Sequence, residues 1–190
     1  MLALQGAVRE HSRVLEALGA EVRPVKRRED LAGLDGIVLP GGESTTIGML
    51  LEEYDMASVL RGGDLPIFGT CAGMILMATE IEGSDQPRLG VMDITVRRNA
   101  FGRQRDSFEE PIAAPAVAPG PVRGVFIRAP FVTEARDGVE VLAHVDGKIV
   151  LCRQGIYLAS SFHPELTDDT RVHRYFLEQI CGARRAVTAR

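Results

Sequence analysis

The sequence predicts an α/β fold in which helices cover a mostly parallel central sheet that also carries an antiparallel portion. Short apolar runs stopped by glycine or proline alternate with helical spacing in the first half, whereas strand patterns dominate the second half. The chain of 190 residues, 45% of them hydrophobic and 25% charged, is large enough to bury a core within one domain. We expect residues 1–182 to form that single domain and residues 183–190, which lack periodicity, to be a frayed C-terminal tail.

The first half of the chain alternates predicted strands and predicted helices. The runs Gly36-Ile37-Val38-Leu39 and Pro66-Ile67-Phe68-Gly69 are continuously apolar, as in strands buried on both faces. The expected strands lie at residues 2–4, 22–25, 36–39 and 66–69, and the expected helices at residues 7–18, 47–54 and 72–79. Because a helix between two strands is the usual crossover of parallel pairing, this alternation predicts a parallel sheet.

The second half favours β-structure and closes with one helix. The expected strands lie at residues 94–97, 124–127, 139–145, 148–152 and 156–162. Asp146-Gly147 predicts a two-residue hairpin turn, so an antiparallel portion should join the parallel sheet. Apolar residues at helical spacing from Val172 to Ile180 predict the closing helix, and the prolines between residues 111 and 121 predict a surface loop.

Charge and composition exclude several classes of function. The net charge of −4 is the opposite of the basic surface that binds a phosphate backbone, so nucleic acid is not an expected partner. No apolar run approaches the ~18 residues of a membrane span, and the amino terminus has no secretory signal pattern. We therefore expect a cytoplasmic protein that is not embedded in a membrane. Cys71, Cys152 and Cys181 form no C-x-x-C pair, which argues against a disulfide framework or a zinc ribbon.

Cys71 stands at the centre of Gly69-Thr70-Cys71-Ala72-Gly73, between a predicted buried strand and a predicted helix. In this context Gly-x-nucleophile-x-Gly forms a sharp elbow that projects the side chain at the carboxyl edge of the sheet. The amino terminus of a helix also favours the thiolate form of a cysteine. Cys71 is therefore a candidate nucleophile, although a cysteine at an arbitrary position is more often a small buried residue.

His163 and Glu165 flank a proline directly after a predicted strand. A residue before proline prefers extended geometry, in which positions i and i+2 face the same way, so Glu165 can orient the imidazole. A histidine held by a carboxylate beside a thiol is the arrangement of a catalytic triad. A lone histidine is more often a surface residue or a satisfied residue, and this is what we expect of His11, His144 and His173.

The segment Pro40-Gly41-Gly42-Glu43-Ser44-Thr45-Thr46 follows another predicted buried strand. Its glycines let backbone N–H groups approach a developing oxyanion, so the segment is a candidate oxyanion loop. The alternative is an ordinary strand-to-helix turn in which Ser44 or Thr45 is the helix N-cap, and both can hold at once. A phosphate-binding loop is not favoured, because the Gly-x-x-x-x-Gly-Lys-Ser/Thr spacing is missing.

Taken together, these three motifs resemble those of the class I, triad-type glutamine amidotransferases. Further stretches resemble a narrower family, the glutaminase subunits of pyridoxal 5′-phosphate synthases, and the resemblance spans nearly the whole chain. The stretches are Leu4 to His11, Arg98 to Gln104, Val125 to Pro130 and Ser161 to Thr167. Cysteine elbows and His-Pro-Glu occur in many amidotransferases, whereas Arg-Asn-x-Phe-Gly-Arg-Gln and Phe-Ile-Arg-Ala-Pro are specific to this subunit family.

The resemblance implies a flavodoxin-like three-layer α/β/α sandwich and a set of site residues. Cys71 is then the nucleophile, His163 the general base and later acid, and Glu165 its orienter. The residues implied to hold glutamine are Gly42, Glu43, Ser44, Arg98, Ile127 and Arg128. A guanidinium suits the α-carboxylate of the substrate, and Glu43 could take its α-ammonium group. We expect N–H groups near Gly42 and Ala72 to form the oxyanion hole.

The implied reaction is the hydrolysis of L-glutamine to L-glutamate and ammonia through a cysteine thioester. Ammonia must be kept from bulk water to remain useful to an acceptor, and this need predicts a partner enzyme. By resemblance the partner is the barrel-shaped synthase subunit that builds pyridoxal 5′-phosphate, and the helix over residues 7–18 is the implied docking element. The glutaminase itself should need neither a metal nor a cofactor.

Three other functions stay open on the sequence. The chain could be another class I amidotransferase glutaminase, or a cysteine hydrolase or peptidase on the same type of sheet, which would not need Arg98 or Arg128. It could also be a catalytically silent binding module that regulates a partner, in which case an intact Cys71, His163 and Glu165 set is a coincidence. Glutamate release by the complex with the partner separates these functions.

Overall fold

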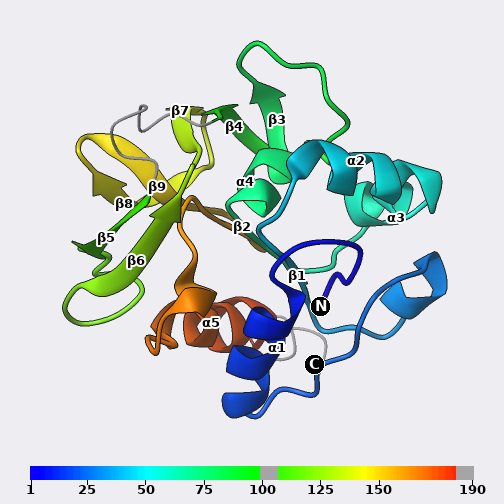
Figure 1. The fold of residues 1–190 in the computed structure, drawn as a ribbon, viewed down its shortest axis with the longest axis horizontal. Helices are drawn as coiled ribbons and strands as arrows, with labels where there is room; N and C mark the ends of the chain where they lie inside the picture. The colour runs from blue at the N-terminus through cyan, green and yellow to red at the C-terminus, as the bar shows by residue number, and fades with distance from the viewer. Residues whose placement is uncertain (99–106, 183–190) are drawn as a thin grey trace.

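The computed structural model describes residues 1–98 and 107–182 of the chain (Figure 1). Two expectations therefore concern residues outside the described ranges. They are the frayed tail at residues 183–190 and residues 99–104 of the stretch that resembles the subunit family. Within the part of the chain that the structure describes, no helix is both long enough and apolar enough to cross a membrane.

Strands and helices alternate in the first half of the chain, and the second half is mainly β-structure, as predicted. The α-helices are α1 (Val8–Ala17), α2 (Ser44–Glu53), α3 (Ala57–Gly62), α4 (Ala72–Met77) and α5 (Arg171–Tyr175). The strands are β1 (Ile37–Leu39), β2 (Ile67–Thr70), β3 (Ala78–Ile81), β4 (Met92–Arg97), β5 (Ser107–Ile112), β6 (Val122–Ile127), β7 (Phe131–Ala135), β8 (Glu140–Val145), β9 (Lys148–Gln154) and β10 (Tyr157–Ser160). Two short 3-10 turns are η1 (Arg28–Leu31) and η2 (Pro164–Leu166), and α5 continues into a π-helical turn, η3 (Phe176–Cys181).

The central sheet is mixed, with the strand order β1-β2-β10-β9-β7-β4-β3 and with β8 paired to β9. β1, β2 and β10 are parallel neighbours, as are β3 and β4, whereas the pairs made by β9 and β7 with their neighbours are antiparallel. A separate hairpin, β5–β6, lies at the left in Figure 1. The predicted α/β sheet with an antiparallel portion is confirmed, and that portion includes β7, which lies outside every predicted strand.

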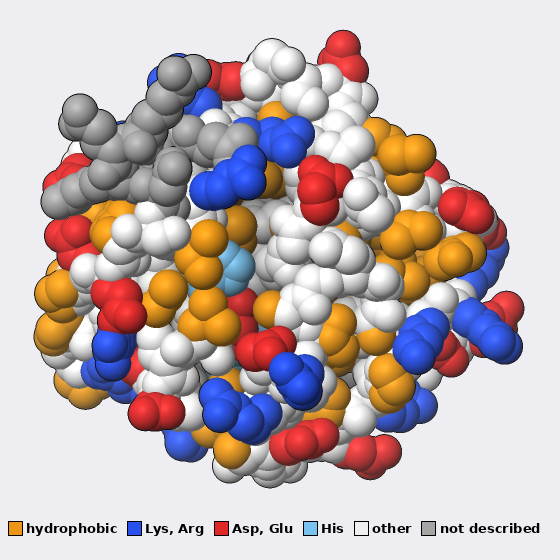
Figure 2. All heavy atoms as spheres, in the orientation of Figure 1, with side chains coloured by type: hydrophobic (Ala, Val, Ile, Leu, Met, Phe, Trp, Pro, Cys, Tyr) orange, Lys and Arg blue, Asp and Glu red, His pale blue; other side chains and the backbone are white. Residues whose placement is uncertain are grey.

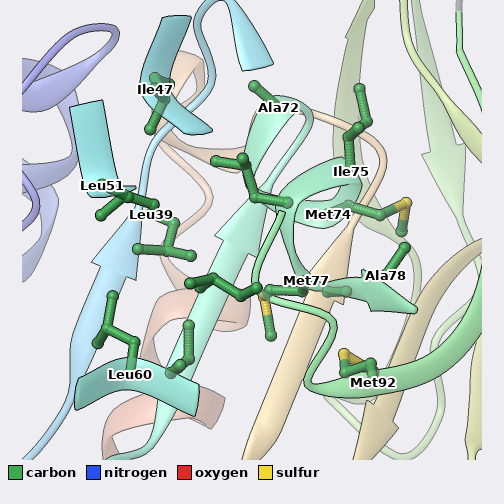
Figure 3. Close-up of a cluster of buried hydrophobic side chains, with 14 of the residues drawn as sticks. Leu39, Ile47, Leu51, Leu60, Ala72, Met74, Ile75, Met77, Ala78 and Met92 are labelled. Carbon is green, nitrogen blue, oxygen red and sulfur yellow. The ribbon is translucent and has the colours of Figure 1, made fainter. Parts of the chain in front are cut away.

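Helices cover both faces of the parallel part of the sheet. Because successive side chains of a strand point to opposite faces, Leu39 and Ile67 face one layer of helices and Val38 and Phe68 face the other. The first layer is formed by α2, α3 and α4, whose buried residues in Figure 3 include Ile47, Leu51, Leu60, Met74 and Met77. The second layer is formed by α1, α5 and η3, whose buried residues include Leu15, Val172 and Phe176. This is the three-layer α/β/α arrangement that the resemblance implies.

The three parallel strands β1, β2 and β10 end at the same level. Leu39 pairs with Gly69, and Gly69 in turn pairs with Ala159, so the segments that follow the three strands start beside one another. The carboxyl ends of parallel strands are the usual place for a ligand site in an open α/β sheet. The edge carries all three motifs that the sequence singles out.

Two departures from the predicted boundaries have a clear physical cause. The helix expected over residues 72–79 ends at Met77, because the chain turns there into β3 and pairs with β4. Pro111 and Ile112 belong to β5 rather than to a surface loop. Among residues 1–98 and 107–182, β5 pairs with β6 alone, and an edge strand tolerates a proline, which has no N–H to donate.

The strands expected at residues 2–4 and 22–25 are reduced to a single parallel bridge between Leu2 and Val25. Leu2 N–H also donates to the Val38 carbonyl oxygen at 3.0 Å, so this segment still borders β1. α3 and β7 lie outside every predicted element, since neither segment is long enough to show a clear apolar period.

Glycines let α4 pack closely against the ends of β1 and β2. A methyl group added at Gly73 would lie 2.3 Å from the Leu39 carbonyl oxygen, and one added at Gly69 would lie 2.6 Å from the Gly73 carbonyl carbon. Both distances are far shorter than van der Waals contact in a close-packed interior. The two glycines around the cysteine are therefore needed for the close approach of backbone to backbone.

We expect Gly73→Ala to lower the free energy of unfolding by about 1–3 kcal/mol or more, because the added methyl group must displace backbone rather than a movable side chain. Denaturant unfolding measures this change. The matched control is Gly62→Ala at the end of α3, where nothing lies within 4 Å of the added methyl group. Equal stability of the two variants would contradict the close packing of α4 on the sheet.

Candidate active site

Cys71 occupies the sharp turn between β2 and α4. Its φ of 50° and ψ of −99° place a non-glycine residue in a sparsely populated region, which is the strain of a nucleophile elbow. Its backbone N–H donates to the Ser160 carbonyl oxygen at 2.7 Å and so ties the elbow to β10. The residue is partly exposed, unlike Cys152 and Cys181, which are buried.

His163 and Glu165 follow β10 at the same edge. The His163 Nδ1 atom lies 2.7 Å from Glu165 Oε1, and the Glu165 side chain is fully buried. The expected extended geometry is wrong: the chain forms the 3-10 turn η2, with Pro164 at its start. The turn nevertheless brings the carboxylate to the imidazole. His163 is itself anchored, because its backbone N–H donates to the Val125 carbonyl oxygen at 2.8 Å.

Opposing effects set the pKa of His163. Burial lowers it, but hydrogen bonds to the Cys71 sulfur and the Glu165 carboxylate, together with the negative charge that each of these groups carries when ionised, raise the pKa to about 10. Because Nδ1 faces Glu165, Nε2 is the ring nitrogen left for the sulfur. An imidazole held in this way can take a proton from the thiol and return it to a leaving group.

The candidate oxyanion loop lies against the imidazole. A methyl group added at Gly41 would lie 2.3 Å from His163 Cε1, so only glycine allows this approach. The Gly41 N–H donates to Thr70 Oγ1 at 3.1 Å, and the Gly41 carbonyl oxygen accepts from the Ala7 N–H at 2.9 Å. Gly42 is packed against the Gln5 side chain, whose Oε1 would lie 2.4 Å from an added methyl group. The loop is thus held between β2 and the start of α1.

Glu43 is the N-cap of α2, a role that the sequence assigns to Ser44 or Thr45. Its carboxylate accepts hydrogen bonds from the backbone N–H groups of Thr45 at 3.2 Å and Thr46 at 2.7 Å. Burial acts to raise the pKa of Glu43, but the hydrogen bonds from Thr46 and Thr45 lower it overall, so the carboxylate is charged at neutral pH.

Gln86 connects several of the residues that the resemblance assigns to glutamine. The Arg98 Nη1 donates to Gln86 Oε1 at 2.6 Å, and the buried Ser44 hydroxyl donates to the same oxygen at 3.3 Å. The Arg98 Nη2 lies 3.5 Å from Glu43 Oε1. Glu43, Ser44 and Arg98 are therefore gathered beside one another. Nothing in the sequence pattern of residues 82–90 marks Gln86, which sits in a non-helical segment.

Ile127 and Arg128 lie at the end of β6, the strand whose Val125 carbonyl oxygen anchors His163. Ile127 is one of the few large apolar side chains that are exposed, and Arg128 has a positive φ of 45°. A positive φ at a non-glycine residue is a strained conformation of the kind that clusters at functional sites. The end of β6 thus places both residues close in sequence to Val125, whose carbonyl oxygen binds the His163 N–H.

Figure 2 shows one face of the molecule, with a hollow near its centre and a histidine side chain on the floor of the hollow. Hydrophobic side chains lie beside the histidine, and basic and acidic side chains lie above it. Within residues 1–98 and 107–182, no group of three His, Cys, Asp or Glu side chains is arranged to hold a metal ion.

The sequence leaves open whether His11 and His173 lie at the surface or are satisfied by hydrogen-bond partners. Both side chains are fully buried, and they lie within hydrogen-bond distance of each other. His11 lies on α1 at helical spacing from Val14 and Leu15, so its burial follows from the apolar face of that helix. Its contact with the candidate triad, 3.4 Å from His11 Nε2 to Glu165 Oε2, could not be predicted from spacing.

Residues 1–182 match the family described as the SNO glutamine amidotransferase family. The chain belongs to this family. The expected membership of the glutamine amidotransferases is thereby confirmed.

Curated relatives of this glutamine amidotransferase match nearly its whole length. A protein of Carboxydothermus hydrogenoformans named pyridoxal 5′-phosphate synthase subunit PdxT is 57% identical, and the match covers 95% of this chain and 96% of that protein. A protein of the same name from Pelotomaculum thermopropionicum is 59% identical over 96% of this chain and 95% of that protein.

Solved structures agree with the fold. A crystal structure described as a glutamine amidotransferase has a TM-score of 0.90 and 52% sequence identity, and the match covers 95% of this chain and 97% of that chain. A crystal structure of a putative GMP synthase component from Thermoplasma acidophilum has a TM-score of 0.69 at 18% identity and shows the fold alone. The predicted α/β fold of the class I glutamine amidotransferases is confirmed.

The raised pKa of His163 gives a pH dependence with a definite sign. Because the folded-state value of about 10 lies above the ordinary value of 6.5, protonation of His163 stabilises the fold fully below pH 6.5, and this contribution is lost as the pH rises toward 10. In a Glu165→Gln variant one of the two charges that oppose burial is absent, so we expect a lower pKa for His163. Histidine NMR titration measures it.

The control for this titration is His144→Gln, which removes an exposed histidine in β8 and should leave the His163 resonance unchanged. An unchanged His163 pKa in Glu165→Gln would contradict the view that Glu165 holds the protonated imidazole.

Proposed function

We propose that this chain is the glutaminase subunit of a pyridoxal 5′-phosphate synthase. It hydrolyses L-glutamine to L-glutamate and ammonia, and it passes the ammonia to a synthase subunit. The observation that carries the proposal is the His163–Glu165 pair, 2.7 Å apart, at the same edge of the sheet as the Cys71 elbow. The full-length relatives named as subunits of this synthase support the choice of acceptor reaction.

In the proposed reaction Cys71 is the nucleophile, His163 the general base and acid, and Glu165 the residue that orients His163. The Cys71 sulfur attacks the carboxamide carbon, and His163 takes the thiol proton and gives it to the departing ammonia. A glutamyl thioester remains on Cys71. Water that His163 activates then attacks the thioester carbon, which releases glutamate and returns the proton to the sulfur.

Backbone N–H groups of Gly42 and Ala72 form the proposed oxyanion hole. Ala72 is the first residue of α4, directly after the nucleophile, and a residue at this position of an elbow supplies an N–H to the oxyanion. Gly42 directly follows Gly41, which lies against the His163 ring. Donors held by the fold stabilise the developing charge without reorganising during the reaction.

The proposed glutamine site is formed by Gly42, Glu43, Ser44, Arg98, Ile127 and Arg128. Arg98 and Glu43 place opposite charges within 3.5 Å of each other, which suits the α-carboxylate and the α-ammonium group of a zwitterionic amino acid. Gln86 holds the Arg98 guanidinium in this position. A peptide substrate has no free α-carboxylate beside its side-chain amide, so this pair favours free glutamine over a peptide.

The proposed partner is the barrel-type synthase subunit, with α1 as a docking element. Residues 1–182 are proposed to act as a single glutaminase domain in the cytoplasm, and the family match over these same residues supports that boundary. We propose that the glutaminase requires neither a metal nor a cofactor, because a thiol, an imidazole and backbone donors suffice for amide hydrolysis.

In the complex with the synthase subunit, we expect Cys71→Ala to reduce glutamine-dependent synthesis of pyridoxal 5′-phosphate by roughly 10⁴-fold or more. Synthesis from added ammonium salts should be unchanged, because the variant lacks only the nucleophile. The control is Cys152→Ala in β9, where complete burial raises the pKa of the thiol to about 12 and makes it unreactive. Equal loss of both activities in Cys71→Ala would point to a structural role for Cys71.

The glutamine site is tested by Arg98→Gln. Loss of a charge-assisted contact to the α-carboxylate should raise KM for glutamine about 10- to 100-fold. Arg97→Gln is the matched control, because this neighbouring guanidinium pairs with Glu82 at 2.5 Å rather than with Glu43 or Gln86. Steady-state glutamate release measures both variants, and an unchanged KM in Arg98→Gln would remove Arg98 from the glutamine site.

A further inference from the structure

A chain of buried polar side chains continues behind the candidate triad into the layer of α1 and α5. Glu165, His11 and His173 are each fully buried. The His11 Nε2 lies 3.4 Å from Glu165 Oε2, and the His11 Nδ1 lies 2.8 Å from His173 Nε2. Phe68 lines this group, with ring centroids 6.4 Å from His11 and 5.6 Å from His173. A polar group in such surroundings is costly unless it is hydrogen-bonded.

The second oxygen of the Glu165 carboxylate depends on His11. Oε1 faces His163, whereas Oε2 makes no well-directed hydrogen bond to any residue within 1–98 and 107–182, and its polar contact is with His11 Nε2. Hydrogen bonds at catalytic groups are often long in a ligand-free enzyme and shorten in the substrate complex. The contact at 3.4 Å is therefore a donor–acceptor pair that a small movement completes.

His11 carries one ring proton, and its neighbours decide where that proton sits. Burial, and secondarily the neighbouring His173, lowers the pKa of His11 well below 6.5, so the ring is neutral. A proton on Nε2 points at Glu165 and leaves Nδ1 to accept from the His173 Nε2–H. The other tautomer would turn a lone pair toward the carboxylate and leave a buried, unpaired N–H at His173 Nδ1, which has no partner among the described residues.

His11 also connects the triad to the candidate oxyanion loop. Its Nε2 lies 3.0 Å from Thr70 Oγ1, and the same oxygen accepts the Gly41 N–H at 3.1 Å. Thr70 is the residue directly before the nucleophile, and Gly41 contacts the His163 ring. One N–H on α1 thus faces both the carboxylate and the strand end that carries Cys71.

We propose that His11 is a positioning residue for glutamine hydrolysis: its Nε2–H, shared between Thr70 and Glu165, fixes the Glu165 carboxylate and through it the His163 imidazole. This inference rests on the proposed function, since it assigns His11 a role only if Glu165 orients a catalytic histidine. His11 touches neither the sulfur nor the substrate in this scheme.

Two amide variants of similar chemistry test the role of the Nε2 position. The longer side chain of His11→Gln can place an N–H near the former Nε2, whereas that of His11→Asn reaches only the former Nδ1. In the complex with the synthase subunit, we expect His11→Asn and His11→Leu to lower kcat for glutamine hydrolysis about 10- to 100-fold with KM little changed. His11→Gln should recover most of the lost kcat.

A proton NMR signature separates positioning from a general loss of stability. The strongly hydrogen-bonded His163 Nδ1–H proton should give a downfield resonance in the wild type and in His11→Gln, and this resonance should shift or broaden in His11→Asn. The control is His144→Leu, a change of an exposed histidine that should alter neither kcat nor the resonance.

Wild-type kcat in folded His11→Asn, or equal loss of kcat in His11→Gln and His11→Asn, would overturn the inference. Glu165→Gln, assayed alongside, separates this failure from that of the proposed function. If Glu165→Gln loses activity and His11→Asn does not, only the role of His11 is wrong. If Glu165→Gln also keeps the wild-type kcat, the proposed triad itself is wrong.

Discussion

The shared parallel register of β1, β2 and β10 is the constraint on which the candidate site depends. Leu158 lies beside Phe68 and Ala159 beside Gly69, so three segments that are far apart in the sequence leave the sheet at one level. A slip of β10 by one residue would turn all of its side chains to the opposite helix layer. The burial of alternate side chains in two separate cores therefore fixes the register, and the register brings Cys71 and His163 together.

Two further features lie at this edge of the sheet: close packing at glycines, and a group of buried polar side chains. Gly69 and Gly73 allow strand and helix backbones to meet directly, and Gly41 leaves room for the His163 ring against the loop. Behind the edge, Glu165, His11 and His173 form a polar chain inside an otherwise apolar layer. Buried polar groups of this kind are weak evidence for stability, and the positioning role proposed for His11 gives this chain a function at the His163 imidazole.

Local patterns in the sequence are sufficient for much of the fold and for the proposed nucleophile. Continuous apolar runs predict the buried parallel strands, and Gly-x-Cys-x-Gly after such a run predicts the elbow at Cys71. The partners in space cannot be predicted in this way. Ser44 reaches Gln86, and His11 reaches Glu165, across large separations in the chain, and no sequence pattern indicates either contact. The N-cap of α2 is Glu43 rather than a hydroxyl residue, because its carboxylate reaches two backbone N–H groups at once.

In the proposed reaction Cys71 forms a covalent bond to the glutamyl group, while His163, oriented by Glu165, transfers the proton. Rapid acid quenching of the complex during turnover, followed by peptide mass spectrometry, tests it most directly. We expect a glutamyl adduct on the peptide that contains Cys71, and no adduct on Cys152 or Cys181. Turnover with no adduct on Cys71, or with an adduct on another residue, would contradict it.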